Sequence, residues 1–201
     1  VGAFAWSAGL ESAIAARIVH DRATTQAWIE GVLIHGGLRT DAILFAHAHA
    51  AAHDAAALRE LADLCLALTP ARERYEETTI TGTAFATAVR AWPTPVLANL
   101  PAPCPYPIAV GAIAAGHGIA LDAALPAWLT SSVHSQVSVA VRLVPIGQSD
   151  GLAIMATLEP AIAAMAELCQ HAALDEIGAV AYAADIAQMS HETLTTRIFR
   201  S

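Results

Sequence analysis

The sequence predicts an all-α protein that folds as a single-domain helical bundle. Hydrophobic residues make up 56% of the 201 residues and charged residues only 14%, a balance that favours a large buried core and excludes intrinsic disorder. Alanine, the strongest helix former, fills about a quarter of the chain. Aromatic residues are only 5%, and few stretches alternate β-branched and polar residues, so a β-sandwich or barrel is not expected.

Start and stop signals divide the chain into successive helices. Ser7 and Thr40 are placed to cap helices, Gly36-Gly37 to end one, and Thr69-Pro70 to begin one. The expected helices cover, in order, residues 7–20, 26–34, 40–68, 70–91, 107–116, 122–144, 149–171 and 179–188. A proline-rich connector occupies residues 92–106, and residues 189–201 form a tail. Nothing marks a second domain, so we expect one helical domain over residues 1–201.

The middle of the sequence is almost free of charge. Between Arg90 and Arg142 the only charged residue is Asp122, and a helix that is apolar on all sides is usually the centre of a bundle. Prolines and polar residues interrupt these apolar runs, so they are not expected to span a membrane. A surplus of apolar surface is typical of a partner-binding protein, although a large alanine-rich core explains the pattern equally well.

The charged residues exclude several classes of protein. Every basic residue is Arg, and without Lys the chain has neither the phosphate-binding lysine of a P-loop nor the Schiff-base lysine of a pyridoxal phosphate enzyme. The net charge of -8 and the scattered arginines argue against nucleic-acid binding. Three cysteines without a C-x-x-C pair argue against a disulfide framework or structural zinc and fit a cytoplasmic protein. The first residues lack the features of a signal peptide.

Histidines provide the one candidate metal site. His49 and His53 lie four residues apart on an expected helix and would share a face. They make a helical metal-dependent enzyme an alternative, but the segment offers no evident further ligand, so a solvated or capping histidine run is the preferred interpretation. His191-Glu192 begins the zinc-protease pattern H-E-x-x-H, but Thr195 occupies the place of its second histidine. No resident metal or other cofactor is therefore expected.

The tail ends in two arginines that flank large apolar residues, Arg197-Ile198-Phe199-Arg200-Ser201. Free termini usually carry small polar residues, whereas apolar anchors beside arginine are typical of interface hot spots. We therefore expect a docking tail. A tail that folds back on its own core is the alternative.

Five segments in order resemble the urease accessory protein UreF family. They are residues 2–11 (G-x-F-x-x-S-x-G-L-E), 71–82, 107–111 (P-x-A-x-G), 142–148 (R-L-x-P-x-G-Q) and 185–201 (ending H-E-x-x-x-T-R-x-F-x-S). The motif residues whose roles stay open are Ser7, Gly9, Glu11, Arg72, Gly82, Arg142, Gln148, His191 and Glu192. Burial of an unpaired carboxylate is costly, so Glu11 is expected to have an Arg or backbone partner. Chains of this family usually begin with a further apolar segment, which precedes this numbering.

The resemblance implies an all-α cytoplasmic chaperone without catalytic activity of its own. Such a protein forms a homodimer, binds the accessory protein UreD (also called UreH), recruits the GTPase UreG and docks on apo-urease for nickel insertion, with regulation of GTP hydrolysis as a proposed part of its role. By motif, Phe4 matches an aromatic position near the partner surface and Arg197 an arginine that fixes the tail for UreG recruitment. Ile198, Phe199, Arg200 and Ser201 match the tail that engages UreD. A plain helical dimerisation module without a link to nickel is the remaining alternative.

Overall fold

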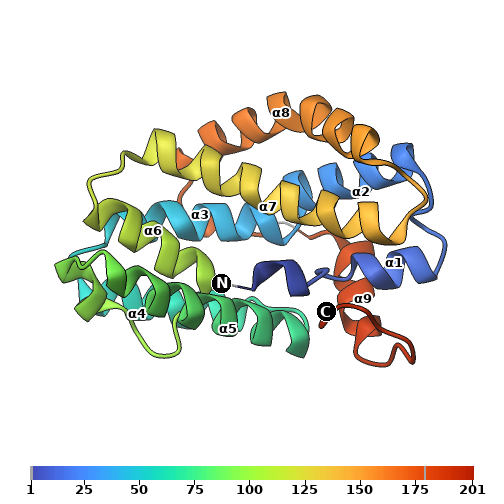
Figure 1. Cartoon of the computed structure of the whole chain (residues 1–201). Helices are drawn as coiled ribbons and strands as arrows, with labels where there is room; N and C mark the ends of the chain where they lie inside the picture. The colour runs from blue at the N-terminus through green and yellow to red at the C-terminus, as the bar shows by residue number, and fades with distance from the viewer. Residues whose placement is uncertain (1, 179) are drawn as a thin grey trace.

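In the computed structural model, which describes residues 2–178 and 180–201, the chain folds into helices with no strand among those residues (Figure 1). The all-α prediction is confirmed. The α-helices are α1 (Leu10–Ala15), α2 (Arg22–His35), α3 (Gly37–Ala50), α4 (Ala55–Ala67), α5 (Arg72–Ala88), α6 (Tyr106–Gly116), α7 (Leu121–Leu143), α8 (Gln148–His171) and α9 (Tyr182–His191). Short 3-10 helices cover Ala3–Ala5, Val89–Ala91, Pro95–Asn99 and Leu174–Glu176.

Helix α3 lies at the centre of the bundle and contacts α2, α4, α6, α7 and α8. Its residues pack into two hydrophobic clusters. Ile43 and Phe45 belong to the cluster shared with α2, α7 and α8, while Leu44 and Ala48 belong to the cluster shared with α4 and α6. The sequence instead predicted that the nearly charge-free middle of the chain forms the centre of the bundle. That prediction holds for α6, most of whose residues are buried, but it missed α3.

The predicted long helix over residues 40–68 is two helices. Helix α3 ends at Ala50, and α4 begins at Ala55 because the Asp54 carboxylate accepts hydrogen bonds from the backbone N–H groups of Ala56 (2.9 Å) and Ala57 (3.1 Å). Asp is a preferred N-cap residue for this reason. The apolar spacing continues across the break, so periodicity alone could not locate it.

The first two helices also begin at residues other than those predicted. Gly9, with φ of 82°, is the N-cap of the short α1, and Asp21 caps α2 through a reciprocal pair of bonds with Thr24. The last helix was predicted from Ala179, which lies outside the described residues, and the observed α9 begins at Tyr182. The segment predicted as a connector, residues 92–106, contains the 3-10 helix Pro95–Asn99, and α6 begins at Tyr106.

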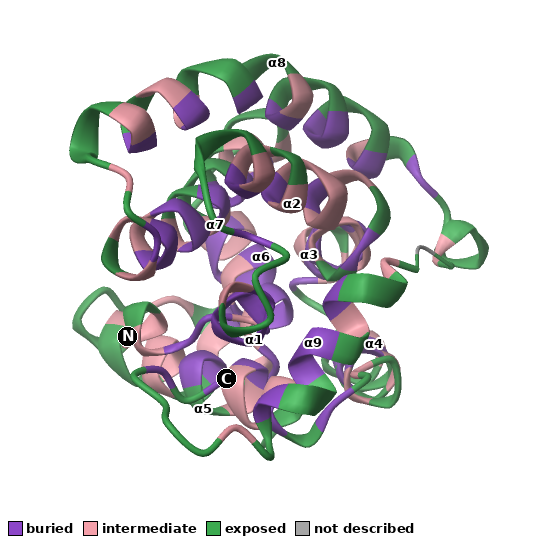
Figure 2. Ribbon diagram, turned by 90° about the vertical axis from the view of Figure 1, so that its right-hand side faces the viewer, coloured by how far each residue is buried: buried purple, intermediate pink, exposed green. Residues whose placement is uncertain are grey.

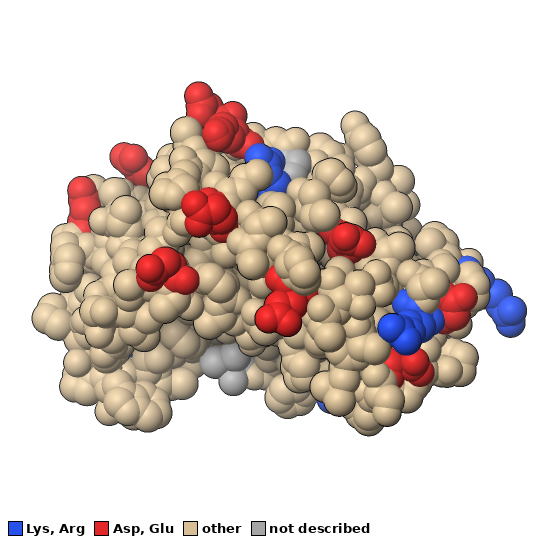
Figure 3. Space-filling model, turned by 90° about the horizontal axis from the view of Figure 1, so that it is seen from above, with Lys and Arg blue, Asp and Glu red and all other residues tan. Residues whose placement is uncertain are grey.

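Helix α8 closes one side of the bundle. It packs against α7, α2 and α3, and Figure 2 shows its buried residues on the side that faces the bundle and its exposed residues outside. It is the one helix among the described residues that is long and apolar enough to cross a membrane, and a third of its most apolar stretch is buried. On the face seen in Figure 3, carboxylates are scattered over a largely uncharged surface, and arginines gather mainly at one end, next to carboxylates.

The close approach of α3 and α6 depends on Gly111, because an added Cβ would collide with the backbone oxygen of Phe45. We expect Gly111→Ala to lower the free energy of unfolding by about 1–3 kcal/mol, as overpacked cores do. Gly31 in α2 is the matched control, since a Cβ there would meet nothing within 4 Å. Gly31→Ala should stabilise the protein by about 0.5–1 kcal/mol. Urea unfolding followed by circular dichroism measures both, and equal effects would contradict the packing argument.

Candidate partner-binding site

The two ends of the described chain meet beside α1 and α9 (Figure 1). The Ser7 backbone N–H donates a hydrogen bond to the backbone oxygen of Ser201 at 2.9 Å, and the Ser7 hydroxyl bonds to the same oxygen. The Ala8 N–H donates to the Ser201 hydroxyl at 3.1 Å, and the Arg200 N–H donates to the Ala5 oxygen at 2.9 Å. The opening and closing motifs are therefore parts of one structural unit.

Glu11, in the first turn of α1, is the main acceptor for the tail. It is buried. Its Oε1 accepts the Ile198 N–H at 2.7 Å, and its Oε2 accepts the Phe199 N–H at 3.0 Å. The backbone partner expected for Glu11 is thus present. These bonds fix the tail main chain against the start of α1.

His191, the last residue of α9, joins Glu11 to Glu73 on α5. The fully buried imidazole places Nε2 at 3.0 Å from Glu11 Oε2 and Nδ1 at 2.7 Å from Glu73 Oε2. Each ring nitrogen thus lies within hydrogen-bond distance of a different buried carboxyl group, so one imidazole joins the two glutamates. Glu73 Oε1 in turn accepts from Arg197 Nη1 at 2.7 Å. We call Glu11, Glu73, His191 and Arg197 the tail latch.

Two cation–π contacts continue the attachment of the tail. The Phe199 ring is buried in the cluster around α1 and α7, with the Arg142 guanidinium carbon 5.9 Å from its centroid. The Arg200 guanidinium carbon lies 4.9 Å from the centroid of the buried Trp6 ring. Such contacts hold an arginine without removing it from water. Arg142, whose role the sequence left open, therefore supports the tail.

The remaining motif residues have distinct positions. Gly9 has a positive φ and packs so closely that a Cβ would lie 2.7 Å from the Gln188 nitrogen. Gly82 lies against the backbone oxygen of Cys104, which a Cβ would strike. The Arg72 N–H donates to Glu192 Oε1 at 3.0 Å. Gln148 is exposed at the start of α8. Close packing explains the two glycines, and contact with the tail explains Arg72 and Glu192.

The predicted docking residues divide into two groups. Phe199 and Ser201 are buried against their own chain, so for them the structure shows the alternative, a tail that folds back. Phe4 and Arg200 are exposed, and Ile198 is 72% exposed. Arg197 is partly exposed beside Glu73. Partner binding by these residues stays a prediction.

One face of α9 exposes large apolar side chains. Tyr182, Ile186 and Met189 are 75%, 61% and 48% exposed, and their spacing places them on one side of the helix. We call these three residues the α9 face. This segment was predicted only as a helix that leads into the tail, although its apolar spacing can be read from the sequence. Exposed apolar faces are typical of protein interaction sites.

His49 and His53 do not lie on a shared helix face. His49 lies on α3, but α3 ends at Ala50, so His53 lies beyond it in a turn. His49 Nε2 is 2.8 Å from the backbone oxygen of Ile119. No group of three or more His, Cys, Asp or Glu residues suited to a metal occurs within residues 2–178 and 180–201. The spacing argument for His49 and His53 was therefore wrong.

A second buried ionic cluster, between α3 and α5, was not predicted from the sequence. Arg74 on α5 contacts Asp41 on α3 and lies 3.3 Å, Nη1 to Oε2, from Glu77. Burial raises the pKa of both Asp41 and Glu77, and Arg74 only partly opposes this effect. The adjacent side chains of Glu76 and Glu77 diverge on α5. Glu76 pairs with Arg72 on the surface, whereas Glu77 faces inward.

The fold and the site define an all-helical protein that exposes an apolar helix face beside a tail held against its own core. The UreF family model matches residues 19–159. The urease accessory protein UreF of Agrobacterium fabrum is 45% identical over 201 residues, which cover all of this chain and 90% of that protein. UreF of Methylobacterium sp. is 46% identical over 208 residues, covering all of this chain and 83% of that protein. The chain belongs to the UreF family.

We expect His191→Ala to lower the free energy of unfolding by about 3 kcal/mol or more, because two buried carboxylates lose their common partner. Tryptic cleavage after Arg197 should accelerate in the same variant, since the latch no longer holds the tail. His53→Ala, at an exposed position, is the control and should match the wild type in both measurements. A His191 variant with wild-type stability and protection would show that the latch contributes little.

The raised pKa of Glu77 predicts a pH dependence with a definite sign. A carboxyl group that binds its proton more tightly in the folded state stabilises that state at low pH. The contribution is lost as the pH rises above the ordinary value of 4.5 and through the raised pKa. Glu77→Gln removes it, so the variant should gain stability relative to the wild type as the pH rises.

Urea unfolding across weakly acid to neutral pH measures this difference. Glu76→Gln changes the neighbouring surface carboxylate and should follow the wild-type curve closely. A stability difference for Glu77→Gln that stays constant with pH would contradict the assignment.

Proposed function

We propose that this protein is a urease accessory protein that acts in urease maturation by binding other maturation proteins, without catalysing a reaction itself. Membership of the UreF family supports the role in maturation. The α9 face is the observation that carries the binding part, because three large apolar side chains stand exposed beside an attached tail. The proposal includes a cytoplasmic location and a homodimer.

We infer that UreD, also called UreH, binds the α9 face together with Ile198. His191, at the end of α9, and the backbone of Ile198 both bond to Glu11, so the helix and the tail share one anchor. Apolar anchors with flanking arginines are the usual centres of protein interfaces. The same complex recruits UreG through the tail at Arg197 and docks on apo-urease, with nickel as cargo.

The tail latch supports this proposal energetically. A flexible tail would lose conformational freedom on binding, at about 0.5–1.5 kcal/mol for each immobilised side chain. Here Phe199 and Ser201 are already buried and the main chain of Ile198 is already bonded. Only exposed side chains remain to be ordered when a partner arrives. The latch thus prepares the surface for binding.

The two alternatives have less support. A metal-dependent enzyme at His49 and His53 loses its basis because the two residues do not share a helix face. A plain dimerisation module without a link to nickel leaves the family membership unexplained.

The α9 face can be tested by size-exclusion chromatography with light scattering, with the protein alone and mixed with UreD and UreG from the same source. We expect the wild type to elute alone as a dimer and to join a larger complex with both proteins. The double variant Tyr182→Ser and Ile186→Ser should keep its helical circular dichroism and lose at least about tenfold in affinity for UreD, which corresponds to about 1.4 kcal/mol.

Leu152→Ser is the matched control, because Leu152 is similarly exposed but lies on α8. It should bind UreD as the wild type does. Retention of full UreD binding by the α9 variant, or equal loss in the control, would reject the assignment of this face.

A further inference from the structure

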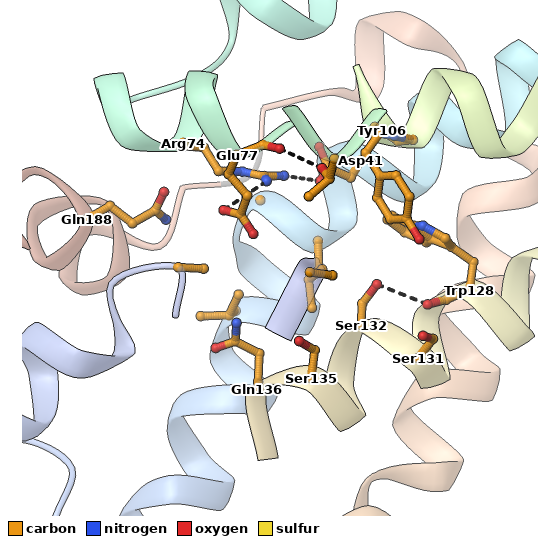
Figure 4. A pocket seen from close by; sticks show the side chains of 17 residues that line it. Asp41, Arg74, Glu77, Tyr106, Trp128, Ser131, Ser132, Ser135, Gln136 and Gln188 are labelled. Carbon is orange, nitrogen blue, oxygen red and sulfur yellow. Dashed lines mark hydrogen bonds and ion pairs between the residues drawn. The ribbon is translucent and has the colours of Figure 1, made fainter. Parts of the chain in front are cut away.

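A partly open cavity of about 120 Å³, lined by both polar and apolar residues, lies between α3, α5 and α7 (Figure 4). Asp41 on α3 and Arg74 and Glu77 on α5 form one side, and a polar stretch of α7 that includes Ser135 and Gln136 lies across from them. Gln188 on α9 also lines it, as do Ala3 and Ala8 from the segment before α1. The tail latch is built from other residues, so the cavity is a separate feature of the molecule.

The charges that line the cavity do not balance. Asp41 and Glu77 share the single guanidinium of Arg74, the one Lys or Arg among the described lining residues. The cluster therefore carries one excess negative charge when both carboxylates are ionised. Burial raises the pKa of both carboxyl groups, and Arg74 only partly opposes this effect, so a further cation would favour their ionised forms. A second cation would complete the charge balance.

The lining also has buried polar atoms without hydrogen bonds. They are two acceptors, Glu77 Oε2 and Gln188 Oε1, and one donor, Trp128 Nε1. Arg74 Nη1 lies 3.3 Å from Glu77 Oε2 as an ion pair. The Gln188 residue is only 8% exposed. Buried polar atoms in native proteins nearly always have partners. The rings of Tyr106 and Trp128 also line the cavity, and aromatic faces attract cations.

We propose that this cavity binds a small monocation that carries N–H donors, of the guanidinium or ammonium class. The positive charge compensates Glu77, and the N–H groups donate to Glu77 Oε2 and Gln188 Oε1. A volume of about 120 Å³ holds several water molecules, so a cation of this size fits. The inference goes beyond the proposed function and does not depend on it.

Thermal unfolding in the presence of four solutes at about 10 mM tests the proposal. Ligands that bind only the folded state raise Tm, so guanidinium and ammonium should raise it by about 3 °C. Tetramethylammonium has the charge without N–H groups, and urea has N–H groups without the charge. Both should leave Tm unchanged. General denaturant action cannot imitate the effect, because guanidinium as a denaturant lowers stability.

Glu77→Gln keeps the shape of the side chain and removes its charge, so the guanidinium-dependent rise should disappear. Glu159→Gln, at an exposed position on α8, should keep the full rise. Gln188→Met, which removes the acceptor at similar volume, provides a second variant if Glu77→Gln does not fold, and should reduce the rise. No response of the wild type to guanidinium or ammonium would overturn the proposal, as would equal responses to tetramethylammonium or in Glu77→Gln.

Discussion

The buried carboxylate of Glu11 is the constraint on which the shape of one end of this protein depends. A carboxylate removed from water needs hydrogen-bond donors, and Glu11 obtains all three of its tail and α9 donors from residues 180 or more positions away. Those donors belong to His191, Ile198 and Phe199. To supply them, α9 must end against α1, and the tail must turn back beside the segment that leads into α1. The meeting of the two ends is thus a consequence of one buried charge.

The bundle makes that geometry possible by holding three helices in fixed positions. Helix α1 packs on α7, and α5 packs on α6, which in turn packs on the central α3. Glu73 therefore stands at a fixed distance from Glu11, and His191 fits between them. Two glycines allow the close approaches, Gly9 at Gln188 on α9 and Gly82 at the chain before α6. Core packing thus determines the position of the polar site, and the polar site determines the path of the tail.

Local sequence signals predicted most helices but few of the contacts at the site. Helices α6 and α7 could be predicted from the prolines and the apolar runs in the sequence. The break at Asp54 was missed because the apolar spacing of α3 continues into α4. The tail latch could not be predicted, since nothing near His191 indicates that its partners are Glu11 and Glu73. Asp41 was missed for the same reason, because its partner Arg74 lies on another helix. The motif resemblance marked the important residues, and only the fold showed what they contact.

The hydrogen bonds between Ser7 and Ser201 also bear on the order in which contacts form during folding. Contacts between residues 194 positions apart require the helices between them to be in place, and such non-local contacts form late because the intervening loop must close first. The attached tail therefore indicates that α1, α9 and the bundle between them have packed. A partner that recognises the tail in this conformation discriminates against partly folded chains.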